Sequence, residues 1–131
     1  MAQEICQALH PDIEAFSRGL YANPFYEVPA KVTAFLRLRG ITPKAHTPTQ
    51  LSEADLQAAD YVFVMEPEQL EQILDRYAQY TDKCYLLLDF AYGQEKALPD
   101  PICLEGSSFN QQAAILAGAV EKALSRLPYA K

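Results

Sequence analysis

The sequence predicts an α/β domain in three layers, in which a short parallel sheet is covered by helices on both faces. Residues 61–65 (YVFVM) and 84–88 (CYLLL) are continuous apolar runs of strand length. Such runs are typical of strands buried on both faces of a parallel sheet. Segments with helical spacing of apolar residues flank both runs, and this alternation indicates the α/β class.

Three elements are expected ahead of these two strands. Residues 1–9 predict a helix from the spacing of their apolar side chains. Residues 13–16 alternate apolar and polar side chains, which predicts a third strand that stops at Gly19. Residues 28–39 predict a helix with Pro29 in its first turn, where the missing N–H costs nothing.

The remaining elements follow from start and stop signals in the second half. Ser52 is a predicted N-cap for a short helix over residues 52–59. Residues 67–77 predict a helix that opens on a proline, residues 91–107 a loop, and residues 109–127 the last helix, with an apolar stripe along one side. The order predicts three strands among five helices.

Composition excludes several classes of protein. A length of 131 residues fits one domain, residues 1–131. The 11 basic and 17 acidic residues give a net charge of −6, which argues against nucleic-acid or membrane partners. No apolar run approaches the roughly 18 residues of a membrane span. Three scattered cysteines suggest a reduced, cytoplasmic protein, and no ligand spacing predicts a metal or cofactor.

A series of short segments then occurs in a specific order: MAQEI at the start, Ser17-Arg18-Gly19, HTPTQL from His46, ADYVFVM from Ala59 and LPDP from Leu98. Together they resemble the low-molecular-weight protein tyrosine phosphatase family, which includes bacterial protein arginine phosphatases and thioredoxin-coupled arsenate reductases. The resemblance covers essentially all of the chain, so it implies that family's fold.

The resemblance also implies roles for individual residues. Asp100 matches the position of the family's general acid, which protonates the leaving oxygen. Ser17 and His46 match residues that support the phosphate loop by hydrogen bonds. The loop that walls the substrate cleft corresponds to Tyr21, Phe25 and Tyr26. Each has a plainer alternative: Asp100 as a turn residue before proline, Ser17 as a turn cap, and His46 as a packed or solvated side chain.

The family's defining motif is not found in these residues. Members open with an apolar strand and a C-x5-R loop, and this sequence begins at the Met-Ala that usually follows. Six positions after the three cysteines stand Asp12, Phe90 and Phe109, so no cysteine is paired with an arginine. We therefore expect a truncated chain that lacks the first strand, which in the family lies between residues 13–16 and 61–65. Direct pairing of these two strands, cover by a partner chain or a largely molten chain could follow, and we expect self-association.

Two functions follow as hypotheses. In the first, the protein hydrolyses phosphomonoesters on phosphoproteins, and the chain as given is inactive because nucleophile and arginine are absent. In the second, it is a non-catalytic binding module derived from the same fold. Arg18 stands where the family usually has Ala, and Ile102-Cys103 stands where many members have Tyr-Tyr. The second difference weakens the prediction of a phosphotyrosine substrate and leaves other phosphorylated substrates open.

Overall fold

The computed structural model describes residues 1–23, 27–43 and 48–128. Its sheet has two parallel strands, β1 (Val62–Val64) and β2 (Cys84–Leu86), in register from Val62 opposite Cys84 to Val64 opposite Leu86. The chain crosses between them through helix α4 (Pro67–Arg76) and the 3₁₀ turn η1 (Ala78–Lys83). A helical crossover is what parallel neighbours require, so the predicted α/β class is confirmed.

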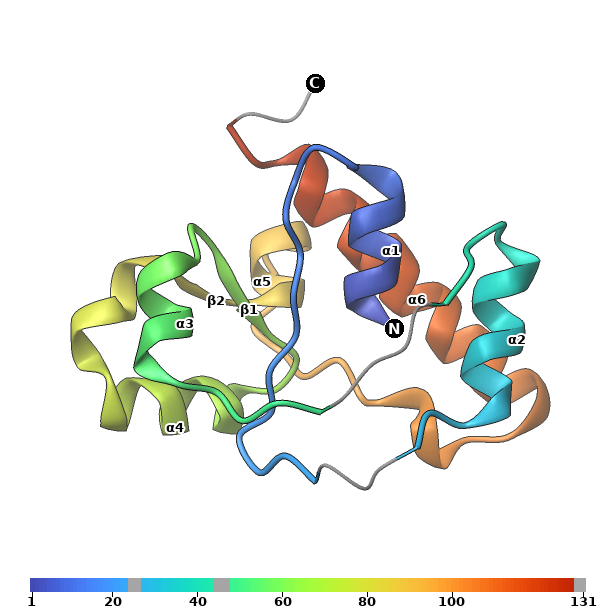
Figure 1. Ribbon diagram of the computed structural model, residues 1–131, viewed down its shortest axis with the longest axis horizontal. Coiled ribbons are helices and arrows are strands. Elements are labelled where there is room, and N and C mark those ends of the chain that lie inside the picture. The colour runs from blue at the N-terminus through green and yellow to red at the C-terminus, as the bar shows by residue number, and fades with distance from the viewer. Residues whose placement is uncertain (24–26, 44–47, 129–131) are drawn as a thin grey trace.

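Helices cover both faces of this sheet (Figure 1). On one face, Val64, Cys84 and Leu86 are buried against α4 and the short helix α3 (Glu53–Ala58). On the other face, Phe63 packs against the main core, and its ring contacts that of Tyr85. This core is built by the helices α1 (Ala2–Leu9), α2 (Ala30–Leu38), α5 (Leu87–Tyr92) and α6 (Gly106–Ser125). The alternation of side chains across each strand produces this division.

Helix α6 is the centre of the main core, and α1 and α5 both pack on it. Its inward stripe is rich in alanine: Ala113, Ala117 and Ala119 are almost completely buried. Small side chains let the neighbouring helices approach closely. The predicted last helix is confirmed, although it begins earlier than expected, at Gly106 rather than residue 109.

Helix α3 is capped at both ends, and the predicted N-cap, Ser52, is confirmed. The Ser52 hydroxyl accepts a hydrogen bond from the Asp55 backbone N–H at 3.4 Å, and the Asp55 carboxylate accepts one from the Ser52 N–H at 3.0 Å. At the other end, the Lys83 ammonium donates to the Leu56 and Ala59 carbonyls at 2.7 and 2.8 Å. Donors and acceptors that the helix itself leaves free are thus satisfied.

Asp55 also pairs with Arg18, whose Nε lies 3.0 Å from its carboxylate. Desolvation raises the pKa of Asp55, but the hydrogen bonds from Ser52 and the charge of Arg18 outweigh it and hold the pKa below its usual value. Because the folded-state pKa is depressed, the stabilisation is present above the unfolded-state pKa of about 3.9 and is lost as pH falls through the folded-state value.

Replacing Ser52 with Ala should lower the free energy of unfolding by about 0.5–2 kcal/mol, because the hydroxyl that accepts the Asp55 N–H is removed. Urea denaturation followed by circular dichroism measures this loss. The control is Ser108→Ala, an exposed serine within α6, which should stay within about 0.5 kcal/mol of the parent chain. Equal values for the two variants would show that the capping box contributes nothing.

The strand predicted over residues 13–16 is not formed, and this prediction was wrong. The alternation is real, since Ile13 and Ala15 are half-buried while Glu14 and Phe16 are exposed. A strand also needs a backbone partner, and here the side chain of Gln7 takes that place. Its amide donates to the Ile13 carbonyl and accepts from the Ala15 N–H at 3.0 Å. The described sheet therefore has two strands instead of three.

Three other boundaries differ from the prediction. Helix α2 begins at Ala30, so Pro29 is its N-cap and does not lie within its first turn. The apolar run 84–88 is a strand only to Leu86, and the chain then turns into α5, which extends to Tyr92. A short, fully buried apolar run has no periodicity that separates strand from helix. The predicted loop 91–107 contains the end of α5, a 3₁₀ turn η2 (Pro101–Cys103) and the start of α6. Among the described residues, no helix is both long and apolar enough to cross a membrane.

Candidate functional site at the carboxyl end of the sheet

The carboxyl end of β1 meets the segment that carries Asp100. The Leu98 N–H donates to the carbonyl of Met65, the residue just beyond β1, at 2.8 Å, and Leu98 is only 2% exposed. In Figure 1 this orange segment runs from beneath β1 toward the foot of α2. Open α/β sheets bind ligands at the carboxyl ends of their strands, so this edge is the candidate site.

Asp100 is exposed and caps the 3₁₀ turn η2. Its Oδ1 accepts a hydrogen bond from the Ile102 N–H at 3.0 Å, and Pro101 follows it as a buried first residue of the turn. The plainer role expected for Asp100, that of a turn residue, is therefore present. Its other oxygen makes no hydrogen bond to the described part of the chain. An exposed carboxyl of this kind can reach a ligand from solvent.

Ser17 lies against the first turn of α1. Its hydroxyl donates to Oε1 of Gln3 at 2.9 Å. The next residue, Arg18, turns the other way: its guanidinium packs over the Phe16 ring at 4.7 Å and pairs with Asp55 of α3. Ser17 is thus tied to the start of α1, while Arg18 ties the same turn to α3.

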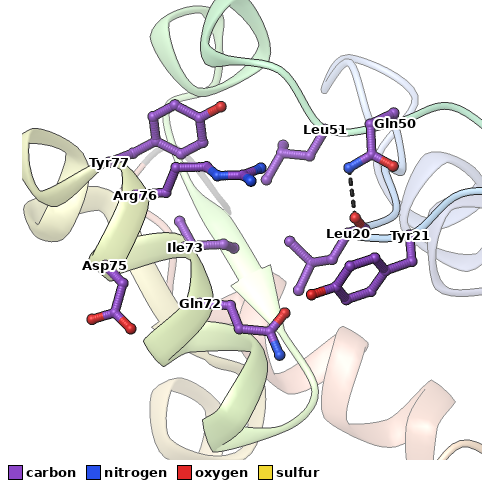
Figure 2. Close-up of a pocket in the computed structure, with 9 residues that line it drawn as sticks. All are labelled: Leu20, Tyr21, Gln50, Leu51, Gln72, Ile73, Asp75, Arg76 and Tyr77. Atoms are coloured by element: carbon purple, nitrogen blue, oxygen red, sulfur yellow. Dashed lines mark hydrogen bonds between the residues drawn. The ribbon is translucent and has the colours of Figure 1, made fainter.

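Tyr21 lines a hollow of about 390 Å³ between α4 and the bridge that joins Gly19 to Gln50. The side chain is 86% exposed. Figure 2 shows its ring and the Arg76 side chain directed into the hollow from opposite sides, with Asp75 turned away. Beside this backbone bridge, the Gln50 side chain donates a hydrogen bond from Nε2 to the Leu20 carbonyl at 2.6 Å.

The structure does not bring all the predicted site residues together. Neither Asp100 nor Ser17 is among the residues that line the hollow beside Tyr21. The other predicted site residues, His46, Phe25 and Tyr26, lie outside the described residues. That Tyr21 lines the wall of a substrate cleft therefore stays a prediction.

The cysteines do not form a substitute nucleophile. Burial raises the pKa of the Cys6 thiol, and burial likewise raises that of Cys84 despite the opposing charge of Lys83. A thiol with a raised pKa is protonated near neutral pH and is a poor nucleophile. Cys103 is exposed on η2, but the residue six positions later is Phe109, a core residue of α6.

Two side chains that hold the candidate site have no recognisable signal in the sequence. Lys31 of α2 binds carbonyls of η2 and the residue after it, and Gln112 of α6 donates to the Pro99 carbonyl at 3.1 Å. Lys31 lies more than 70 positions from its acceptors in the sequence. A lysine on a helix gives no local signal of such a partner.

Comparison with known proteins identifies the family. The family model described as low molecular weight phosphotyrosine protein phosphatase matches residues 1–130. The chain belongs to this family. The resemblance found in the sequence is thereby confirmed over almost the whole chain.

Similar proteins of known sequence or structure are also phosphatases of this kind. A protein-arginine-phosphatase of Geobacillus stearothermophilus is 28% identical over 91 residues, which are 70% of this chain and 61% of that protein. The chain thus spans less than two thirds of the length of this curated relative. The solved low molecular weight protein tyrosine phosphatase of T. tengcongensis superposes with a TM-score of 0.88 at 27% identity, covering 96% of this chain and 88% of the other.

A more distant member shows the fold alone. The YwlE arginine phosphatase from Geobacillus stearothermophilus superposes with a TM-score of 0.82 at 22% identity, over 92% of this chain and 79% of that one. The helices and the short parallel sheet therefore have the arrangement of the phosphatase fold.

Proposed function

We propose that this protein acts in the hydrolysis of phosphomonoesters on cytoplasmic phosphoproteins, with Asp100 as the general acid. Family membership over residues 1–130 is the observation that carries the proposal. The position of Asp100 supports it, because the hydrogen bond from Leu98 to Met65 holds this segment at the carboxyl end of β1. Relatives named as tyrosine and as arginine phosphatases support a phosphorylated protein side chain as the substrate class.

The reaction needs two further groups. A thiolate attacks the phosphorus, and an arginine with loop N–H groups stabilises the charge on the transferring phosphoryl group. Asp100 would donate a proton to the leaving oxygen as its bond to phosphorus breaks. The 131 residues contain no cysteine with arginine six positions later, so by themselves they supply the acid without the nucleophile. A binding function without turnover is the alternative.

The purified 131-residue chain should not hydrolyse p-nitrophenyl phosphate above the background rate. The physical reason is that no C-x5-R is present to provide a nucleophile and a charge clamp. Release of p-nitrophenolate at 405 nm measures the rate. Turnover that survives further purification and disappears in an Asp100→Asn variant would contradict this expectation.

The proposed function itself is tested by extending the chain. A family-type apolar strand and C-x5-R-S-P loop placed ahead of Met1 should create phosphatase activity, while a loop with Cys changed to Ser should not. An extended chain that folds, binds phosphate and fails to turn over substrate would favour the non-catalytic alternative.

A further inference from the structure

The Lys31 side chain of α2 is engaged at every one of its donors. Its Nζ lies 2.5 Å from the carbonyl oxygen of Ile102, 2.6 Å from that of Leu104 and 3.0 Å from Oε1 of Glu105. An ammonium group has three donors, so three acceptors saturate it. The same Nζ also lies over the ring of Phe109, 5.4 Å from the ring centroid. The side chain is only 22% exposed, which is low for a lysine.

The carbonyls that Lys31 holds belong to the turn that Asp100 caps. The Ile102 N–H donates to Oδ1 of Asp100 at 3.0 Å, and the Leu104 N–H donates to the Pro101 carbonyl at 2.9 Å. Ile102 therefore bonds the Asp100 carboxylate through its N–H and the Lys31 ammonium through its C=O. The position of the ammonium and the position of the carboxylate are linked through one residue.

The segment on the other side of Asp100 is held differently. Leu98 is fixed by its hydrogen bond to Met65 and by burial, and the Pro99 carbonyl is held by Gln112 of α6. For residues 101–105, the side-chain hydrogen bonds that reach them from other elements, within the described chain, all come from Lys31. Pro101 is buried and Leu104 packs against the main core, and Lys31 adds the hydrogen bonds that fix the backbone carbonyls of this turn.

The ion pair between Lys31 and Glu105 contributes less to holding the turn than the two hydrogen bonds from Lys31 to the carbonyls. Glu105 is largely exposed, and an exposed ion pair contributes little because water screens it. The two carbonyls are part-buried, and a hydrogen bond from a charged donor to a part-buried carbonyl is stronger than one between neutral groups. A neutral side chain of equal length would leave both carbonyls without this donor.

We propose that Lys31 is a positioning residue for the Asp100 carboxyl group, which it orients by fixing the turn from residue 101 to residue 104. This inference rests on the proposed acid role of Asp100. Lys31 does not touch the reacting atoms in this arrangement. It sets where the carboxyl group stands relative to the carboxyl end of β1, and small misplacements of a catalytic group cost large factors in rate.

The first test uses the 131-residue chain and needs no activity. In Lys31→Met, amide hydrogen exchange measured by NMR should accelerate about tenfold or more at Ile102 and Leu104, because the turn loses its donor. Lys31→Arg should restore most of the protection. The matched control is Lys122→Met, an exposed lysine of α6, which should leave both amides unchanged.

The pattern of exchange decides this test. Acceleration confined to Ile102 and Leu104 supports the positioning role. Unchanged rates at these amides overturn it, and so does a uniform acceleration that includes the Ala59 N–H at the distant end of α3, because that would show a role in overall stability only.

The second test uses the extended, active chain and compares leaving groups. A misplaced acid should matter most for a poor leaving group, so Lys31→Met should lower kcat/KM about tenfold for phenyl phosphate and much less for p-nitrophenyl phosphate. Equal losses on both substrates overturn the proposal. If Asp100→Asn leaves the rates unchanged, the proposed acid role fails. If Asp100→Asn lowers them while Lys31→Met changes nothing, only the role of Lys31 fails.

Discussion

Replacing Asp100 with Asn should slow hydrolysis of phenyl phosphate by about 10²- to 10⁴-fold in a chain that carries a family-type strand and C-x5-R loop ahead of Met1. Asparagine cannot donate the proton that the leaving oxygen needs. Its amide oxygen can still accept the hydrogen bond from the Ile102 N–H, so the turn that Asp100 caps is kept. The variant therefore separates the acid from the turn residue.

The measurement is kcat/KM for phenyl phosphate across pH, with Asp60→Asn as the matched control. Asp60 is an exposed aspartate ahead of β1, and its replacement should leave the rate unchanged. An unaltered rate in Asp100→Asn would assign Asp100 to the turn alone. A comparable loss in both variants would trace the effect to overall charge.

Replacing Phe109 with Ala should lower the free energy of unfolding by about 3–5 kcal/mol. Phe109 is 2% exposed in the first turns of α6. Its ring meets Phe35 of α2 edge to face, with the centroids 6.2 Å apart. Removal of the ring would open a cavity between α2 and α6 and remove the apolar surface beside Lys31.

Urea denaturation of the 131-residue chain measures this loss, with Ile115→Ala as the control on the same helix. Ile115 is 52% exposed and should lose less than about 1 kcal/mol. Because domains are stable by only about 5–15 kcal/mol, Phe109→Leu is the milder companion, with an expected loss of about 1–2 kcal/mol. Equal losses at positions 109 and 115 would contradict the inward orientation of Phe109.

Local signals in the sequence located most of the helices. These signals depend only on residues close in the sequence. Ser52 caps the helix that follows it, Pro67 has a fixed φ angle that suits the first turn of a helix, and residues 109–127 carry apolar side chains at helical spacing. The continuous apolar character of residues 61–65 and 84–88 predicted buried strands of a parallel sheet, and the structure shows that residues 62–64 pair with 84–86. The order of motifs identified the family, and with it the fold class.

The candidate site was predicted only in part. The family's motifs pointed to Asp100 and Ser17 as candidates, but not to the side chains that contact them. Whether Asp100 faces a ligand depends on Leu98, Gln112 and Lys31, which come from other parts of the chain. Such contacts leave no periodic or local trace in a single sequence.

The sequence by itself determined the α/β class, the family, and the positions of helices α1, α2, α3, α4 and α6 to within a few residues, but it missed α5. Only the tertiary structure decided that residues 13–16 do not form a strand and how the turn after Asp100 is anchored. Alternation can suit a strand, but a strand exists only where a neighbouring backbone supplies hydrogen bonds, and here Gln7 supplied them instead. The turn is likewise held by Lys31 from a distant helix, because free carbonyls are satisfied by whatever donor the packed fold brings to them.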